Sequence, residues 1–124
     1  MKNKIKRIIE IETETFTNID LSGAQLQGKN LNYECFEDSC LKNADLSKAK
    51  LNGANLISVD LTGADLSCAD LSYADLDFAD LRFTNLYKTK LYGAIINKTK
   101  IDRTTLDKFF EVFTNEQIDN LIFI

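Results

Sequence analysis

The chain has 124 residues, of which 27% are charged and 44% hydrophobic, and its formal net charge is −4. This length and composition are typical of one compact domain. The sequence contains no histidine, tryptophan or proline. A histidine base and histidine metal ligands are therefore excluded.

The first eight residues (1–8) form a basic segment, and Glu10 and Glu12 follow closely. These acidic residues interrupt any apolar run that a signal peptide or a membrane span would need. We therefore expect residues 1–8 to be disordered or to form a partial cap, and the protein to be cytoplasmic with no membrane partner. Three cysteines cannot all pair within one chain, so we expect free thiols in a reducing compartment: Cys35, Cys40 and Cys68.

A large apolar residue recurs at every fifth position, and a mostly small residue stands two positions before each of these centres. Period five matches neither a helix nor a strand, so the chain must turn a corner every five residues. Four corners give a coil of twenty residues, and stacked coils pair as short parallel strands about 4.8 Å apart. The centres are Phe16, Leu21, Leu26, Leu31, Phe36, Leu41, Leu46, Leu51, Leu56, Leu61, Leu66, Leu71, Leu76, Leu81, Leu86, Leu91, Ile96, Ile101 and Leu106.

The run ADLSCADLSYADLDFADL (Ala64–Leu81) resembles the A(D/N)LXX motif of the pentapeptide-repeat family. The resemblance implies an all-β solenoid, a right-handed quadrilateral parallel β-helix. Extended back to Ile9, the repeat covers residues 9–108, which make five coils of four repeats each. The motif is specific for this fold and says little about function.

The first coils depart from the motif. Glu14, Lys29 and Glu34 stand where the small residue is expected. Stacked inward carboxylates are costly, so we expect a local distortion that turns them outward, with a ligand-binding carboxylate pair as the alternative. Phe16 and Phe36 are twenty residues apart and are predicted to stack inside the core.

The acidic and glycine positions are expected to be structural. The aspartates at successive motif positions fall on different sides of the coil, so they are predicted to accept hydrogen bonds from turn backbone rather than to bind metal. The glycines follow their centres by two residues, where a corner needs positive φ. No zinc spacing or cofactor motif accompanies the cysteines, so no metal or cofactor is expected. The aspartates are Asp60, Asp65, Asp70, Asp75 and Asp80, and the glycines are Gly23, Gly28, Gly53, Gly63 and Gly93.

The period ends after Leu106, and residues 109–124 carry phenylalanines at roughly helical spacing. Thr114 and Gln117 predict a capping box, so we expect two short helices that meet near Thr114. A solenoid end exposes unpaired backbone and leucines, and these helices are therefore predicted to form a C-terminal cap. A homodimer contact through the same helices is compatible with capping, so monomer and homodimer both stay open.

Five aromatic residues follow their centres by one or two positions and are expected to point outward. Outward aromatic side chains on a rod favour a surface for a protein partner. Stacking that only stiffens the rod is the alternative. These residues are Tyr73, Phe78, Phe83, Tyr87 and Tyr92.

A non-enzymatic interaction or scaffold module is the leading hypothesis, because the sequence offers no pair of nucleophile and base. Catalysis through the thiols is a remote third hypothesis. Since some pentapeptide-repeat proteins imitate duplex DNA and bind DNA gyrase, the resemblance implies a gyrase-binding, quinolone-protecting DNA mimic as the alternative. Residues 51–81 hold six aspartates and no basic residue, but residues 82–108 carry +5. Duplex DNA is acidic throughout, so this pattern counts against mimicry. The basic coil has no recognition motif, and direct nucleic-acid binding is not expected.

Overall fold

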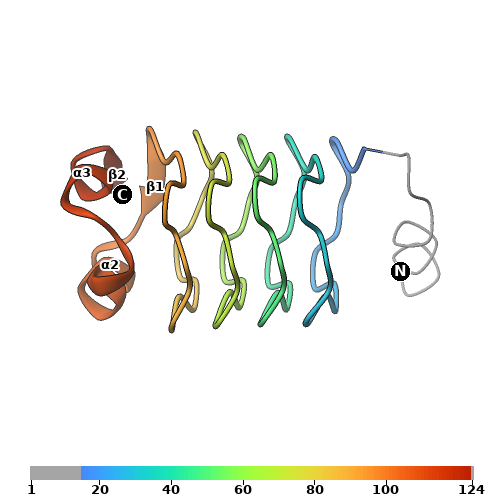
Figure 1. Ribbon diagram of the computed structural model, residues 1–124, viewed down its shortest axis with the longest axis horizontal. Coiled ribbons are helices and arrows are strands. Elements are labelled where there is room, and N and C mark those ends of the chain that lie inside the picture. Colours follow the sequence, from blue (N-terminus) through green and yellow to red (C-terminus); the bar gives the residue numbers. More distant parts are fainter. Residues whose placement is uncertain (1–14, 124) are drawn as a thin grey trace.

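The computed structural model describes residues 15–123 and shows a stack of four-sided coils with helices at one end (Figure 1). Parallel bridges join residues that are twenty positions apart, from Asp20 and Cys40 at one end to Asp80 and Lys100 at the other. Each coil therefore contains four repeats. The solenoid predicted from the five-residue period is confirmed.

The core is a column of apolar centres backed by small residues. Leu41 and Leu71 are fully buried. The rings of Phe16 and Phe36 stack with centroids 4.8 Å apart and planes at 14°, as their spacing predicts. A threonine in the small column buries its hydroxyl without cost only if it is paired, and Thr89 Oγ1 indeed donates to a carbonyl of the neighbouring coil at 2.8 Å.

The corners have one backbone geometry whatever residue occupies them. The third residue of each repeat has positive φ from Asn18 to Lys98, at the glycines as predicted and also at bulky residues such as Tyr73 (φ 61°). Where an aspartate or asparagine precedes the centre, its side chain fixes the turn. Asp60 accepts the backbone N–H of Thr62 at 3.0 Å, and equivalent bonds recur along the stack. The predicted structural role of the aspartates is confirmed.

The distortion expected for the carboxylate pair is wrong at Glu34, and the backbone at Lys29 is regular as well. Both backbone N–H groups make the regular turn bond, at 3.2 and 3.3 Å, and both carbonyls accept bonds from the next coil at 2.9 Å. Lys29 is exposed and Glu34 is half-buried, so these side chains leave the core without any change in the backbone. Glu14 and the expected segment 1–8 lie outside the described residues.

The repeat was expected to continue to residue 108, but helix α2 (Arg103–Phe109) begins earlier. Asp102 causes the change. Its Oδ1 accepts the N–H of Phe83 at 2.8 Å, and its Oδ2 accepts the N–H of Thr105 at 2.9 Å. In the coils before it a backbone carbonyl takes the first of these bonds. One carboxylate thus replaces the backbone carbonyl in the bonding between coils at this corner and forms the N-cap of the helix.

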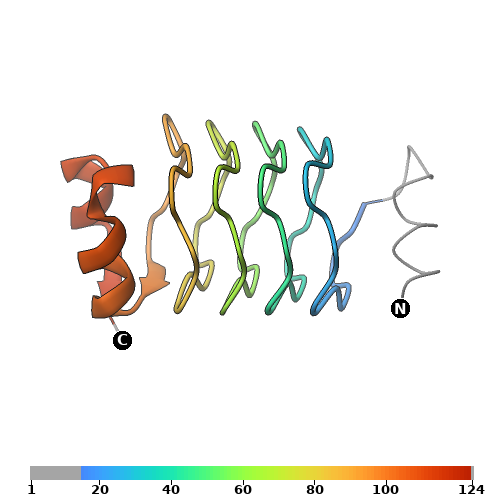
Figure 2. The same ribbon diagram turned by 90° about the horizontal axis from the view of Figure 1, so that it is seen from below.

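The chain continues through a 3-10 helix, η1 (Phe110–Val112), and α3 (Asn115–Asp119), and the helices lie across the end of the stack (Figure 2). The capping box of Thr114 and Gln117 is present as predicted. The expectation of helices alone is wrong, because β2 (Leu121–Phe123) pairs in parallel with β1 (Thr99–Ile101). The unpaired edge of β1 accounts for this strand. No helix in the described part of the chain has the length and apolarity needed to cross a membrane.

Candidate interaction site

The structure places the five predicted aromatic residues at corners of the last two coils. Tyr73, Phe78, Phe83, Tyr87 and Tyr92 are all more than half exposed, and Tyr92 is 71% exposed. They do not form one patch. Residues five positions apart occupy successive corners of a four-sided coil, so Tyr73, Phe78 and Phe83 point from three different corners.

Tyr73 and Tyr92 are the pair that the fold brings together. Their ring centroids are 5.6 Å apart with planes at 87°, an edge-to-face arrangement that stabilises aromatic pairs. The Tyr73 ring also lies over Gly93, where a Cβ atom would come within 2.6 Å of two ring carbons. The absence of a side chain at Gly93 therefore leaves the space that the Tyr73 ring occupies.

Tyr33 was missed by the sequence analysis although it is 80% exposed. It occupies the same corner column as Tyr73, and its ring lies over Gly53 as that of Tyr73 lies over Gly93. Tyr33 and Tyr73 are forty residues apart, which is two full coils, and this separation could have identified them as equivalent positions. Tyrosine and glycine thus alternate along one corner of the stack.

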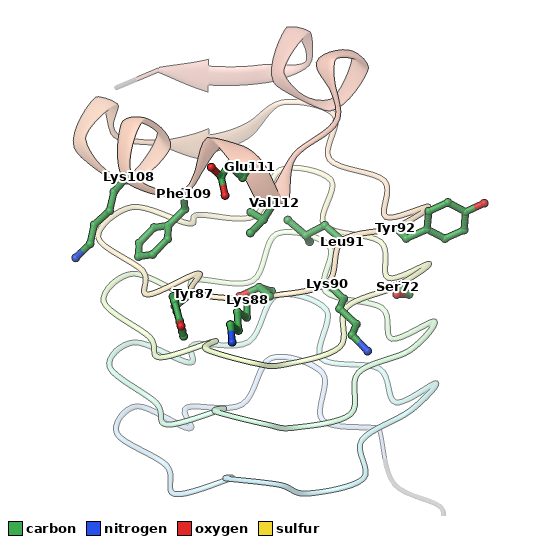
Figure 3. A pocket seen from close by; sticks show the side chains of 11 residues that line it. Ser72, Tyr87, Lys88, Lys90, Leu91, Tyr92, Lys108, Phe109, Glu111 and Val112 are labelled. Carbon is green, nitrogen blue, oxygen red and sulfur yellow. The ribbon is translucent and has the colours of Figure 1, made fainter.

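A groove of about 710 Å³ separates the last coil from the end of α2 and η1. Figure 3 shows Phe109 and Val112 above it and the segment from Tyr87 to Tyr92 below it. Its size falls in the range of ligand-binding clefts. Two of its residues, Tyr87 and Tyr92, belong to the predicted aromatic set, whereas the helical residues gave no signal because their approach depends on the turn at Asp102.

Three lysines belong to the lining of this groove, Lys88, Lys90 and Lys108. Lys88 Nζ lies 5.3 Å from the Tyr87 ring centroid, and Lys108 Nζ lies 5.3 Å from that of Phe109. Such cation–π contacts leave the positive charges uncompensated. The ion pairs found in the described residues are formed elsewhere, by Lys42 with Asp60 and by Arg82 with Asp80.

Two aspartates on the sides of the solenoid, the half-buried Asp70 and the buried Asp80, are held ionised. Burial raises the pKa of Asp70, but hydrogen bonds from Ser72 and Asn52 and the charge of Lys90 outweigh it and leave the pKa below its ordinary value. Burial likewise raises the pKa of Asp80, and its bonds to Arg82 and the charge of Lys100 bring the pKa below normal. Both groups therefore stay charged to a lower pH than a free aspartate does.

None of the three cysteine thiols lines the groove. Cys35 and Cys40 are half-buried, Cys68 is exposed, and all three are free cysteines. Cys40 Sγ lies 3.2 Å from Ser22 Oγ, and Cys35 Sγ lies 3.6 Å from Thr17 Oγ1. Within residues 15–123 no group of three cysteine, aspartate or glutamate side chains is arranged to hold a metal ion.

Comparison with known families agrees with this geometry. A family model described as pentapeptide repeats matches residues 39–76 and 69–107, with eight copies of the repeat. Pentapeptide-repeat proteins form right-handed quadrilateral β-helices, in agreement with the stacked four-sided coils. No curated protein matches the chain.

The chain is also similar to solved structures. The chain is 39% identical to alr5209, a pentapeptide-repeat protein from Nostoc PCC 7120, with a TM-score of 0.71, and the match covers 85% of this chain and 84% of that one. A pentapeptide-repeat protein from the thylakoid lumen of Arabidopsis thaliana is 34% identical, with a TM-score of 0.43 and coverage of 68% and 55%. Rfr23 from the cyanobacterium Cyanothece 51142 is 35% identical, with a TM-score of 0.39 and coverage of 67% and 60%.

Proposed function

Because the chain belongs to the pentapeptide-repeat family, we propose that it is a non-enzymatic interaction module whose solenoid presents aromatic side chains to a protein partner. The exposed pair Tyr73 and Tyr92 carries this proposal. Tyrosine is enriched at the energetically dominant positions of protein interfaces. A solenoid in which every coil is bonded to its neighbours holds such a pair in place before binding, which lowers the ordering cost of association.

Affinity capture from native cell extract tests this proposal. The tagged full chain is compared with a Tyr73→Ser/Tyr92→Ser variant and with Tyr33→Ser, a matched control whose ring also lies over a glycine in the same corner column. We expect a protein that co-purifies with the unmodified chain and with the control, and is lost from the double variant. Identical captured sets for all three would contradict the proposal.

The C-terminal segment supports a second element of the proposal, a helical cap on the solenoid. Gln117 Nε2 donates to the carbonyls of Leu91 and Ala94 at 2.8 and 3.1 Å, and Phe113 is buried. These groups replace the bonds and contacts that a further coil would provide. Truncation after Lys108 is therefore expected to give an aggregating protein, and a soluble monomer that melts cooperatively would contradict capping.

The same end of the molecule exposes apolar side chains, which favours a homodimer as a further proposal. Phe110, Ile122 and Phe123 are each at least 40% exposed, and exposed apolar groups of this kind mark association surfaces. Light scattering is expected to give twice the chain mass of 14.0 kDa. A monomer mass at the same protein concentration would exclude this contact.

A DNA mimic that binds gyrase is the alternative function. The columns of the stack weigh against it, because Asp70 is followed by Lys90 and Asp80 by Lys100. Each of these two columns ends on a positive charge, whereas duplex DNA is negative along its whole length. The interaction module is therefore the function that the molecule supports best.

A further inference from the structure

The last strand on one side of the solenoid has an open edge. In the coil before it, the N–H of Leu71 donates to the carbonyl of Lys90 at 2.8 Å, and the N–H of Lys90 donates to the carbonyl of Ala69 at 3.0 Å. The same register in the last coil leaves the N–H of Leu91 and the carbonyl of Thr89 facing outward. No described residue bonds to either group. Residues 109–111 would form the next strand if the coils continued, but they end α2 and begin η1 instead.

The other sides of the last coil are covered in three different ways. One side gains a true strand, in which Ile122 of β2 pairs with Lys100 of β1 in parallel register. A second side has α2 against it, with Leu106 buried. On a third side, Gln117 donates to the Ala94 carbonyl. The molecule thus shows that an edge of this solenoid accepts a short parallel strand.

The open edge Thr89–Leu91 forms part of the lining of the 710 Å³ groove (Figure 3). Phe109 and Val112, both half-buried, form an apolar wall on the other side. A strand added here would alternate its side chains between this wall and the solvent. The groove therefore combines backbone groups in need of partners with space for an apolar side chain.

The charge of the groove indicates what kind of segment would bind there. Lys88, Lys90 and Lys108 line it, against Glu111 as the one acidic residue of the lining. Asp70 neighbours Lys90 in the column and offsets part of its charge. Positive charge remains in excess, which favours an acidic segment. A nucleic acid would satisfy the lysines but has no peptide group to pair with Leu91 and Thr89.

We infer that the groove between the open edge Thr89–Leu91 and η1 binds an extended acidic peptide segment of a partner protein, which adds a parallel strand to the solenoid. The residue of the peptide opposite Lys90 donates its N–H to the Thr89 carbonyl, and its own carbonyl accepts a hydrogen bond from the N–H of Leu91. This inference rests on the proposed interaction function and assigns it a second contact beside Tyr92, with a different chemistry.

Display of short random peptides on phage, selected against the immobilised full chain, provides the probe. We expect enrichment of peptides that combine acidic residues with an apolar residue. The most enriched peptide is then measured by fluorescence anisotropy and by hydrogen exchange, where the Leu91 amide is expected to be protected. Absence of acidic enrichment, or an unchanged Leu91 amide in the complex, would overturn the inference.

Charge-reversal variants distinguish binding in the groove from a general effect of net charge. Lys90→Glu/Lys108→Glu is expected to weaken peptide binding by about tenfold or more, since like charges across an interface are strongly unfavourable. Lys48→Glu/Lys50→Glu is the control of equal charge, because neither lysine lines the groove and Lys50 flanks Asp70 in the same column on the side away from it, and its affinity is expected to stay unchanged. Equal losses in both variants would show that only net charge matters and would overturn the inference.

Two competitors complete the test. Inorganic phosphate and a single-stranded oligonucleotide are expected to compete only weakly with the peptide at constant ionic strength, and tight competition by either would show an anion site in place of a strand site. Failure here is distinguishable from failure of the interaction module by a capture experiment with Tyr73→Ser alone, which, unlike Tyr92→Ser, changes no residue of the groove lining. A partner lost in that experiment together with a negative peptide selection would reject the groove alone.

Discussion

At the scale of single residues, the corners of the solenoid show how a repeat imposes conformation on unsuited side chains. Positive φ is inexpensive for glycine and costs other residues about 1–2 kcal/mol. Tyr73, Phe78 and Phe83 nevertheless adopt φ of 61°. The bonds between coils and the turn bond at each corner outweigh this cost. The corner position therefore turns aromatic side chains away from the core.

Gly93→Ala is expected to destabilise the protein more than Gly23→Ala. Both glycines have φ of +69°, so both substitutions share the backbone cost, but only at Gly93 does the new methyl group collide with the Tyr73 ring. Displacing that ring also disturbs its contact with Tyr92, so the extra loss is expected to be about 1 kcal/mol. Urea denaturation measures the difference.

The Tyr73→Ser background provides the control for this pair. Without the ring, the two alanine substitutions are expected to cost the same free energy of unfolding. A difference that persists in this background would show that the Tyr73 ring is not its cause.

At the scale of elements, the transition from coil to helix depends on one buried carboxylate. Asp102→Ala leaves the N–H groups of Phe83 and Thr105 without the partners they have in the native protein. Loss of a helix N-cap together with a second buried bond is expected to cost about 2–3 kcal/mol. The free energy of unfolding from denaturant titration checks this value.

Asp102→Asn is the conservative comparison. The amide keeps one acceptor oxygen, so it is expected to cost less than the alanine substitution. If both variants lose the same stability, the two hydrogen bonds are not what positions α2.

At the scale of the whole molecule, stability is expected to decline in acid. The pKa values of Asp70, Asp80 and Asp102 are lowered in the folded state. The unfolded chain therefore binds more protons than the folded chain as the pH falls. The stabilisation is complete above the ordinary aspartate pKa of about 3.9 and is lost as the pH falls through the lower folded-state values.

Urea titrations across a pH series test this dependence. Without histidine in the sequence, the stability is expected to be flat between about pH 6 and pH 7. Asp80→Asn and Asp102→Asn are each expected to reduce the dependence of the unfolding free energy on pH in acid. A steep change of stability near neutral pH would contradict the assignment.

The charge pattern of the whole rod gives the functional prediction. The protein is not expected to inhibit DNA supercoiling by gyrase at micromolar concentration, and its expression is not expected to confer quinolone resistance. Residues 51–81 are acidic, but residues 82–108 carry +5, and a channel that binds DNA repels the basic coil. A supercoiling assay decides the matter, and dose-dependent inhibition would favour the mimic.

Charge reversal supplies the positive control. Replacing the lysines of the last coil with glutamate is expected to move the rod toward inhibition if its shape is already adequate. The four positions are Lys88, Lys90, Lys98 and Lys100.

The sequence by itself determined the solenoid, because every centre obeys one local rule and each coil only repeats the contacts of the coil before it. The core, the Phe16–Phe36 stack, the glycine corners and the aspartate turn bonds all follow from position within the repeat. Position also predicted that Tyr73 and Tyr92 lie outside the core. These features need no information from distant parts of the chain.

Only the tertiary structure decided what happens where the repetition stops. Asp102 resembles any corner residue in the sequence, and its bond from the N–H of Phe83 exists only because Phe83 lies beside it from the preceding coil. The Leu121–Phe123 segment is too short to be assigned as a strand from its apolar residues alone, and it becomes a strand because β1 presents an open edge. The groove above Thr89–Leu91 arises for the same reason, since the chain enters η1 in place of a further strand and leaves that edge uncovered. End effects depend on long-range partners, and no local period encodes them.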